Sequence, residues 1–163
     1  MLLTLKNKET LIIDDFIFKC CIGKNGTKTR KNEGDQATPK GKFSLGKLYY
    51  RADRVKKPST KLSIKIITKD MGWCDDPKSK YYNKEIKIGN KLRHEKLFKK
   101  NNSYDYFIVI NYNTKKIISN KGSAIFIHLT KGYKKTAGCI ALKEKDFLIL
   151  LKLINSKTKI KIN

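Results

Sequence analysis

The chain is poor in acidic residues and in arginine. It has 14 acidic residues against 38 lysines and arginines, so its formal net charge at pH 7 is +24. The only arginines are Arg30, Arg51, Arg54 and Arg93. Arginine pairs bidentately with phosphate and guanine, whereas lysine acts as a point charge. We therefore expect no nucleic-acid partner, and the charge has two open explanations: another anionic polymer as partner, or AT-rich codon usage.

Long hydrophobic runs are also missing. No stretch approaches the roughly 20 apolar residues that a membrane-spanning helix needs, and the first residues reach a charge at Lys6, so we expect neither an integral membrane segment nor a signal peptide. Yet 39% of the residues are hydrophobic and 10% are aromatic, too many for a disordered basic tail. The length of 163 residues predicts one folded domain over residues 1–163.

Cysteine and histidine are scarce. The cysteines are Cys20, Cys21, Cys74 and Cys139. They are too few for a disulfide scaffold, and none forms a Cys-x-x-Cys metal knuckle. Cys20 and Cys21 are adjacent, so in a strand they would point to opposite faces and serve as structural residues. We expect no metal or cofactor. Any imidazole chemistry must use His94 or His128, the two histidines.

The apolar residues follow short β-type runs separated by Gly, Asn, Asp and Lys. One helix is predicted over residues 144–154, where Phe147, Leu150, Leu151 and Ile154 recur at helical spacing. The fold class is therefore mainly β (α+β). Residues 70–102 are expected to form an elaborated surface loop, and residues 33–41 a scaffold turn. The expected strands are residues 10–21, 42–51, 62–68, 106–112, 115–119, 124–129 and 157–162.

Two residues near the C-terminal end could form a reactive pair. Strand alternation puts His128 on one face with Ala124 and Phe126, and Cys139 follows Gly138, where a hairpin-like return could bring thiol and imidazole together. A nucleophilic thiol needs a base, and backbone N–H groups near Gly138 could stabilise an oxyanion. The alternative is a buried small hydrophobe beside a core histidine, and spacing alone leaves both open.

The segment from His128 to Cys139, which ends in Thr136-Ala-Gly-Cys, resembles the His…Ser/Thr-x-Gly-Cys signature of L,D-transpeptidases with the YkuD-type catalytic domain. Further blocks agree with the compact, single-domain branch of that family over about residues 10–155. These blocks are Glu-Gly-Asp-Gln-Ala-Thr-Pro-Lys-Gly at residues 33–41, Gly-Trp-Cys-Asp-Asp-Pro at residues 72–77 and Gly-Ser-Ala-Ile-Phe-Ile-His-Leu at residues 122–129. The chain departs from the commoner pattern at Ala137, where a second histidine is usual.

The resemblance implies a twisted β-sandwich or barrel, with a long loop and a helix after the catalytic cysteine. It implies that Cys139 is the nucleophile, His128 the general base and acid, and Gly138 the backbone oxyanion site. The substrates would be peptidoglycan stem peptides. Cys139 would expel D-Ala, form a thioester and pass the acyl group to an amine, which makes a cross-link. With water as acceptor, the enzyme would be an L,D-carboxypeptidase or another hydrolase of wall fragments.

Substrate contacts are less sharply defined. Trp73, Tyr82 and Asn83 could flank the cleft, or Trp73 could be a loop anchor buried for packing. Thr136 belongs to the signature and is expected to contact substrate. His94 could be a wall of the groove or an exposed loop residue.

A rival from another class is a non-catalytic basic module that binds a polymer. We expect a monomer in either case. The family resemblance points to the cell envelope or periplasm, whereas the absence of a visible signal peptide leaves the cytoplasm as the alternative.

Overall fold

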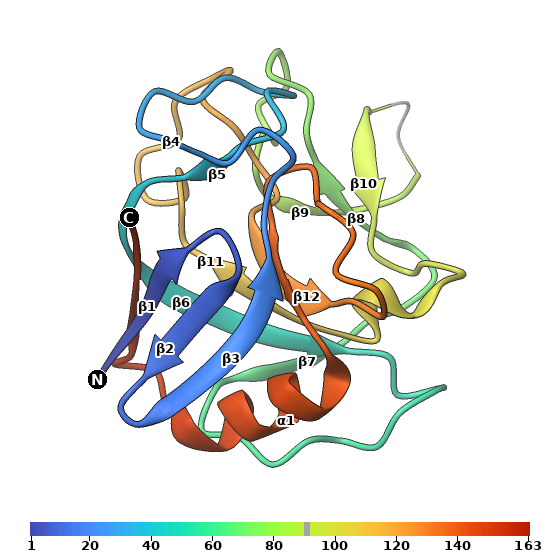
Figure 1. Cartoon of the computed structure of the whole chain (residues 1–163). Coiled ribbons are helices and arrows are strands. Elements are labelled where there is room, and N and C mark those ends of the chain that lie inside the picture. The colour runs from blue at the N-terminus through green and yellow to red at the C-terminus, as the bar shows by residue number, and fades with distance from the viewer. Residues whose placement is uncertain (90–91) are drawn as a thin grey trace.

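The computed structural model describes residues 1–89 and 92–163, and it is mainly β with one α-helix (Figure 1). The strands are β1 (Leu2–Asn7), β2 (Thr10–Ile13), β3 (Phe16–Cys21), β4 (Thr27–Lys28), β5 (Thr38–Pro39), β6 (Gly41–Tyr50), β7 (Ile64–Ile66), β8 (Met71–Cys74), β9 (Glu85–Lys87), β10 (His94–Lys96), β11 (Tyr106–Ile110), β12 (Phe126–Leu129), β13 (Ile140–Leu142) and β14 (Lys159–Ile162). The helices are the 3₁₀ turn η1 (Asn102–Tyr104) and α1 (Glu144–Leu153).

A nine-stranded sheet forms the body of the protein, in the order β11-β12-β13-β3-β2-β1-β14-β6-β7. An additional pairing between β11 and β6 closes this sheet into a barrel, with β7 attached to β6. Helix α1 lies across the end of the barrel that is lowest in Figure 1. The mainly β fold with a helix after Cys139 is confirmed, and α1 ends one residue before the predicted helix, with Ile154 as its C-cap residue.

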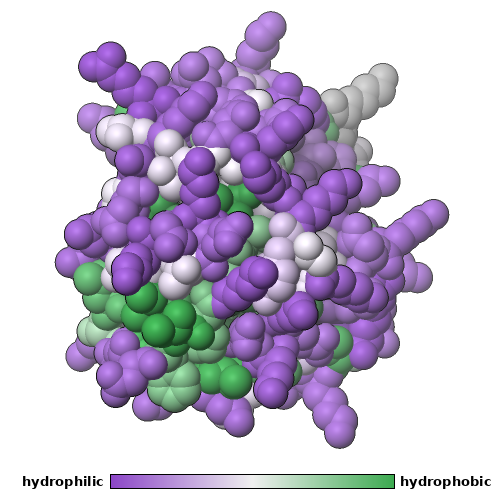
Figure 2. All heavy atoms as spheres, viewed as in Figure 1, coloured by the Kyte–Doolittle hydropathy of each residue, from purple (hydrophilic) through white to green (hydrophobic). Residues whose placement is uncertain are grey.

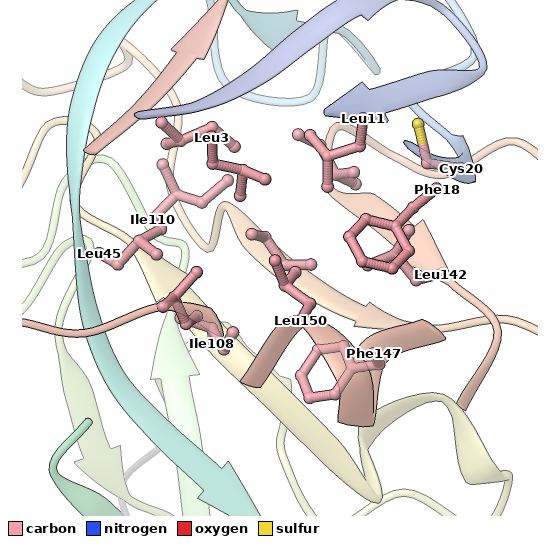
Figure 3. Packing of buried hydrophobic residues seen from close by; sticks show 14 of the residues in the cluster. Leu3, Leu11, Phe18, Cys20, Leu45, Ile108, Ile110, Leu142, Phe147 and Leu150 are labelled. Carbon is pink, nitrogen blue, oxygen red and sulfur yellow. The ribbon is translucent and has the colours of Figure 1, made fainter. Parts of the chain in front are cut away.

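The interior of the barrel is filled by aliphatic side chains that alternate along the strands (Figure 3). In β1, Leu3 and Leu5 are fully buried while Thr4 between them points the other way. Phe147 and Leu150 of α1 join the same cluster, so the apolar face of the helix completes this core.

A second core lies on the other face of β11 and β12. There a three-stranded sheet, in the order β10-β8-β9, packs Trp73 edge-on against Phe126, with 5.2 Å between ring centroids. Ile125, Ile127 and Leu129 face the first core, whereas Phe126 belongs to the second, so the predicted alternation in this strand is confirmed. The second core also contains Cys139. Both faces of β12 are therefore packed, which holds this strand firmly.

One strand prediction near the N-terminus was wrong, and one strand was missed. Residues 10–21 form the hairpin of β2 and β3, because Asp14 adopts a left-handed conformation with φ of 47° and, with Asp15, makes an exposed turn. Strand β1 was not predicted, although its buried leucines alternate.

Residues 115–119 were predicted as a strand and are irregular. The Asn113 side chain accepts from the Ile118 N–H at 2.8 Å and donates to the Ile118 carbonyl at 3.0 Å. These local bonds occupy the backbone groups that a sheet ladder would use. The predicted loop at residues 70–102 was also wrong in part, since it contains β8, β9 and β10. Its residues 90 and 91 lie outside the described residues.

The surface is dominated by hydrophilic side chains, with a hydrophobic area over the β1–β3 region of the view (Figure 2). Phe16 and Ile17 at the β2–β3 hairpin are among the exposed large hydrophobic residues. Within the described residues, no helix has the length and hydropathy required to cross a lipid bilayer.

We predict that Phe147→Ala destabilises the protein by about 3–5 kcal/mol, because it removes a fully buried ring from the first core and leaves a cavity. Urea denaturation followed by circular dichroism measures the free energy of unfolding. The matched control is Phe16→Ala on the exposed hairpin, where the ring is 45% accessible, and its cost should stay below about 1 kcal/mol. Equal losses for the two variants would contradict the assignment of α1 to the core.

Candidate active site

Cys139 and His128 are positioned by two neighbouring strands. His128 lies on β12, and Cys139 directly precedes β13, which pairs with β12 in parallel with Ile127 opposite Ile140. The predicted hairpin-like return between His128 and Cys139 is wrong, because β12 and β13 are parallel and a hairpin would make them antiparallel. Instead, the chain between the two strands first bonds to residues 22–24, where the Thr136 N–H donates to the Ile22 carbonyl at 2.9 Å.

The Cys139 sulfur rests on the backbone of the segment that leads into β12. Its Sγ accepts from the Phe126 N–H and donates to the Ala124 carbonyl, both at 3.3 Å. His128 follows Phe126 by two residues on the same strand, so the Cα atoms of these two residues lie roughly 7 Å apart, and the thiol and the imidazole share one face.

Both side chains line one cavity of about 660 Å³. Cys139 is 8% exposed and His128 is half-buried, so molecules in solution can reach the pair through this cavity. The wall also includes charged residues of both signs, which are Glu33, Asp75, Glu95, Lys99, Lys131, Lys134, Lys135 and Glu144.

The turn before Cys139 is closed by Thr136. Its Oγ1 donates to the Cys139 carbonyl at 2.6 Å and accepts from the Gly138 N–H at 3.1 Å. Gly138 has a φ of 142°, and a Cβ there would lie 2.9 Å from the Ala37 carbonyl oxygen. The close backbone approach predicted for Gly138 is therefore present. The Gly138 N–H donates to Thr136 Oγ1, and the role of Gly138 as the oxyanion site stays a prediction.

Burial sets the protonation of the pair. It raises the pKa of the Cys139 thiol to about 12, partly offset by the Phe126 N–H. It lowers the pKa of His128 to about 4, opposed by the hydrogen bond to the Leu129 carbonyl. At neutral pH the resting pair is therefore a neutral thiol beside a neutral imidazole.

The tautomer of His128 follows from its backbone partner. Nδ1 lies 2.9 Å from the Leu129 carbonyl oxygen, which can only accept, so Nδ1 carries the proton. Nε2 then keeps its lone pair and is the basic nitrogen. The edge of the Tyr104 ring packs against the imidazole at 5.3 Å between centroids, which restricts the orientation of His128.

Sequence reasoning missed Tyr104 and its partners. The Tyr104 hydroxyl donates to Glu95 at 2.9 Å, and Lys99 forms an ion pair with the same carboxylate at 2.6 Å. Burial raises the pKa of Tyr104 well above its usual value, so the hydroxyl stays a donor. Tyr104 lies in η1, whose sequence carries no recognisable motif, and Glu95 lies on β10.

Trp73 and Asn83, predicted to contact substrate, do not line this cavity. The Trp73 indole N–H donates to Asn83 Oδ1 at 2.9 Å, and the same oxygen accepts from the Ala124 N–H at 3.1 Å. Ala124 has a φ of 52°, an unusual conformation for alanine that these contacts hold in place. The two residues thus support the backbone on which the Cys139 sulfur rests.

Tyr82 and His94 also lie outside the cavity wall, whereas Thr136 lines it. The buried Tyr82 hydroxyl donates to Glu33 and accepts from the Gly122 N–H at 2.9 Å. His94 on β10 packs over Gly72 and lines a second cavity of about 550 Å³, which shares Glu95, Lys99 and Asn101 with the first. The substrate roles predicted for Tyr82, Asn83, Trp73, Thr136 and His94 stay predictions.

All four cysteines are free and buried, and Cys21 Sγ donates to the Lys134 carbonyl at 3.2 Å. Among residues 1–89 and 92–163, no group of three or more His, Cys, Asp or Glu side chains is placed to hold a metal ion.

In the comparison with protein-family models, the YkuD L,D-transpeptidase catalytic domain matches the chain over residues 2–162. The chain belongs to this family. No curated protein matches the chain. Family membership supports an enzyme of the L,D-transpeptidase type, and it extends over β1 and β14, beyond the resemblance seen at about residues 10–155.

We predict that Gly138→Ala lowers the rate at which Cys139 reacts with an acylating peptide probe by at least tenfold. The probe forms a thioester with the cysteine. The added Cβ would collide with the Ala37 carbonyl at 2.9 Å, and alanine is strained at a φ of 142°. Labelling is followed by intact mass. The control Gly89→Ala has open space around the added Cβ and lies outside the wall of this cavity, so it should label like the wild type. Undiminished labelling of Gly138→Ala would contradict a role for this backbone approach.

Proposed function

We propose that the protein is a cysteine acyltransferase that acts on peptidoglycan stem peptides. The observation that carries the proposal is the placement of His128 on β12 and of Cys139 directly before the adjacent parallel strand β13, with both side chains lining one cavity. Membership of the L,D-transpeptidase family supports the substrate class.

In the proposed reaction, Cys139 Sγ attacks the carbonyl carbon of the bond that precedes the terminal D-Ala, and His128 Nε2 takes the thiol proton. The tetrahedral intermediate collapses when the C–N bond breaks, and His128 returns the proton to the departing amine of D-Ala. A thioester on Cys139 remains. The raised pKa of the thiol and the lowered pKa of the imidazole favour proton transfer during attack over a preformed thiolate.

An amine of a second stem peptide completes the reaction. His128 accepts a proton from this amine as it attacks the thioester, and the Cys139 thiolate leaves and is reprotonated. The product is a cross-linked peptide. Water is the competing acceptor, since charged residues line the cavity and do not exclude it, and it would make the protein an L,D-carboxypeptidase. Mass spectrometry of the products separates the two outcomes.

The basic surface is compatible with this substrate, because stem peptides carry free carboxylates and the wall polymer is anionic. The cell envelope is the compartment that the proposal implies, and fractionation of cells tests it. A protein found only in the cytoplasm would favour hydrolysis of recycled wall fragments.

We predict that Cys139→Ala lowers D-Ala release from a tetrapeptide by at least about 10³-fold, because the nucleophile is lost. A carbapenem should add covalently to the wild type and not to this variant, as measured by intact mass. Cys20→Ala, whose sulfur lies in the first core, is the matched control and should retain both reactions. Full D-Ala release by Cys139→Ala would contradict the role of Cys139 as the nucleophile, whereas a wild type that shows neither reaction would support the non-catalytic binding module instead.

We also predict the pH dependence of kcat/KM for D-Ala release. His128 must be neutral to accept the thiol proton, and burial lowers its pKa from 6.5 to about 4. Protonation therefore removes the base only as the pH falls through about 4, so activity should stay nearly constant from pH 8 to pH 5. Circular dichroism at each pH excludes acid unfolding. An acid limb centred near pH 6.5 would show that the imidazole is not desolvated as described.

A further inference from the structure

One outward face of the barrel sheet carries exposed aliphatic side chains. The register places Ile17 of β3 opposite Ile12 of β2, and Ile12 opposite Thr4 of β1. Leu2 precedes Thr4 by two residues, so it lies on the same face, where it is opposite Lys159 of β14. Ile17 is 71% accessible and Leu2 is 38% accessible, and the hydrophobic area over β1–β3 is visible in Figure 2.

The next strands of the same face carry lysines. Thr4 lies opposite Lys161 of β14, and Lys161 lies opposite Lys42 of β6. Lys159 shares the face with Lys161, two residues away, and the three lysines are exposed. Like charges on directly opposite residues of a sheet repel each other. An anionic surface next to this face would relieve the repulsion.

The strands that build this face contain no acidic residue, and β1, β2, β3, β6 and β14 are described over their whole length. The nearest acidic residues in the sequence, Glu9, Asp14 and Asp15, lie in the turns at the two ends of β2. Within residues 1–89 and 92–163, the three lysines of the face take part in no ion pair. Their charge is therefore available to a partner.

We propose that this face docks on the surface of a lipid bilayer that contains anionic lipids. The docking face consists of Leu2, Ile12, Ile17, Lys42, Lys159 and Lys161. Anionic headgroups would contact the lysines while the aliphatic side chains enter the interfacial region, and both contributions strengthen binding at a membrane surface. A purely anionic polymer would engage the lysines alone and leave the contiguous aliphatic side chains in water.

The inference goes beyond the proposed function and does not depend on it. None of the six residues of the docking face lines the cavity that contains Cys139 and His128. Docking would therefore hold the protein at a membrane surface without occupying the reactive pair.

Sedimentation of the whole chain with unilamellar vesicles tests the proposal. Vesicles of equal parts phosphatidylcholine and phosphatidylglycerol are compared with vesicles of phosphatidylcholine alone, at physiological ionic strength. The wild type should bind the first and not the second, and added salt should weaken the binding. Ile17→Ser should weaken it by roughly tenfold or more, because an apolar side chain is lost from the interface. Lys42→Gln combined with Lys161→Gln should weaken it by about 25-fold, or roughly fivefold for each lysine.

Each variant has a matched control. Ile66→Ser changes an isoleucine that is 49% accessible on β7, a strand outside the docking face. Lys115→Gln combined with Lys116→Gln makes the same change in net charge at exposed positions outside the sheet. Both controls should bind like the wild type, and circular dichroism shows that every variant is folded.

Three outcomes overturn the inference. The first is a wild type that does not bind the anionic vesicles, and the second is an equal loss of binding in the two double lysine variants. The third is unchanged binding of Ile17→Ser, which would point to an anionic polymer as the partner. D-Ala release from a soluble tetrapeptide should be the same in Ile17→Ser as in the wild type. Failure of the wild type to release D-Ala overturns the proposed function and leaves the vesicle result standing.

Discussion

The contact on which the site depends is that of the Cys139 sulfur with the backbone of residues 124–126. The sulfur accepts one backbone N–H and donates to one carbonyl, and both belong to the segment that carries His128 two residues further on. The parallel pairing of β12 and β13 sets the spacing between His128 and Cys139, and Cys139 belongs to the second core. His128 is therefore held within the sheet, and Cys139 is held at the start of β13 by its contacts with the backbone of residues 124–126.

The backbone around Cys139 is strained at defined points, and each strained residue has a partner that holds it. Ala124 adopts a positive φ that Asn83 supports through its side-chain oxygen. Gly138 lies against the Ala37 carbonyl, which also accepts from the buried Lys31 ammonium at 2.5 Å. The position of the Cys139 sulfur thus depends on contacts from the loop at residues 31–37, from β8 and from the turn after it.

Periodicity in the sequence predicted the strands and the helix whose packing is local. Residues 144–154 have one apolar face, and residues 124–129 alternate between the two cores as expected. The strands predicted at residues 10–21 and 115–119 were wrong, because Asp14 and Asn113 favour turns. A pattern of apolar residues does not reveal such turns. The sheet within residues 70–102 escaped prediction because its strands are three or four residues long.

The sequence identified the pair of Cys139 and His128 through a motif, but not the residues that surround it. Glu33 was assigned to a scaffold turn, because its partners Tyr82 and Ser123 lie 49 and 90 residues away in the chain. Trp73 and Asn83 were selected for their residue types. Only the fold shows that Asn83 accepts from the Ala124 N–H and that Trp73 donates to the same Asn83 oxygen. Long-range side-chain contacts of this kind leave no periodic signal.

The first and last strands of the barrel are neighbours. β1 pairs in parallel with β14, and the Asn163 side chain donates to the Leu5 carbonyl at 3.1 Å. During synthesis, the edges of β1 and β6 stay open until residues 159–162 have emerged from the ribosome, and open strand edges promote association between chains. The order of translation therefore makes barrel closure a late event, with the most non-local pairing in the molecule as its final step.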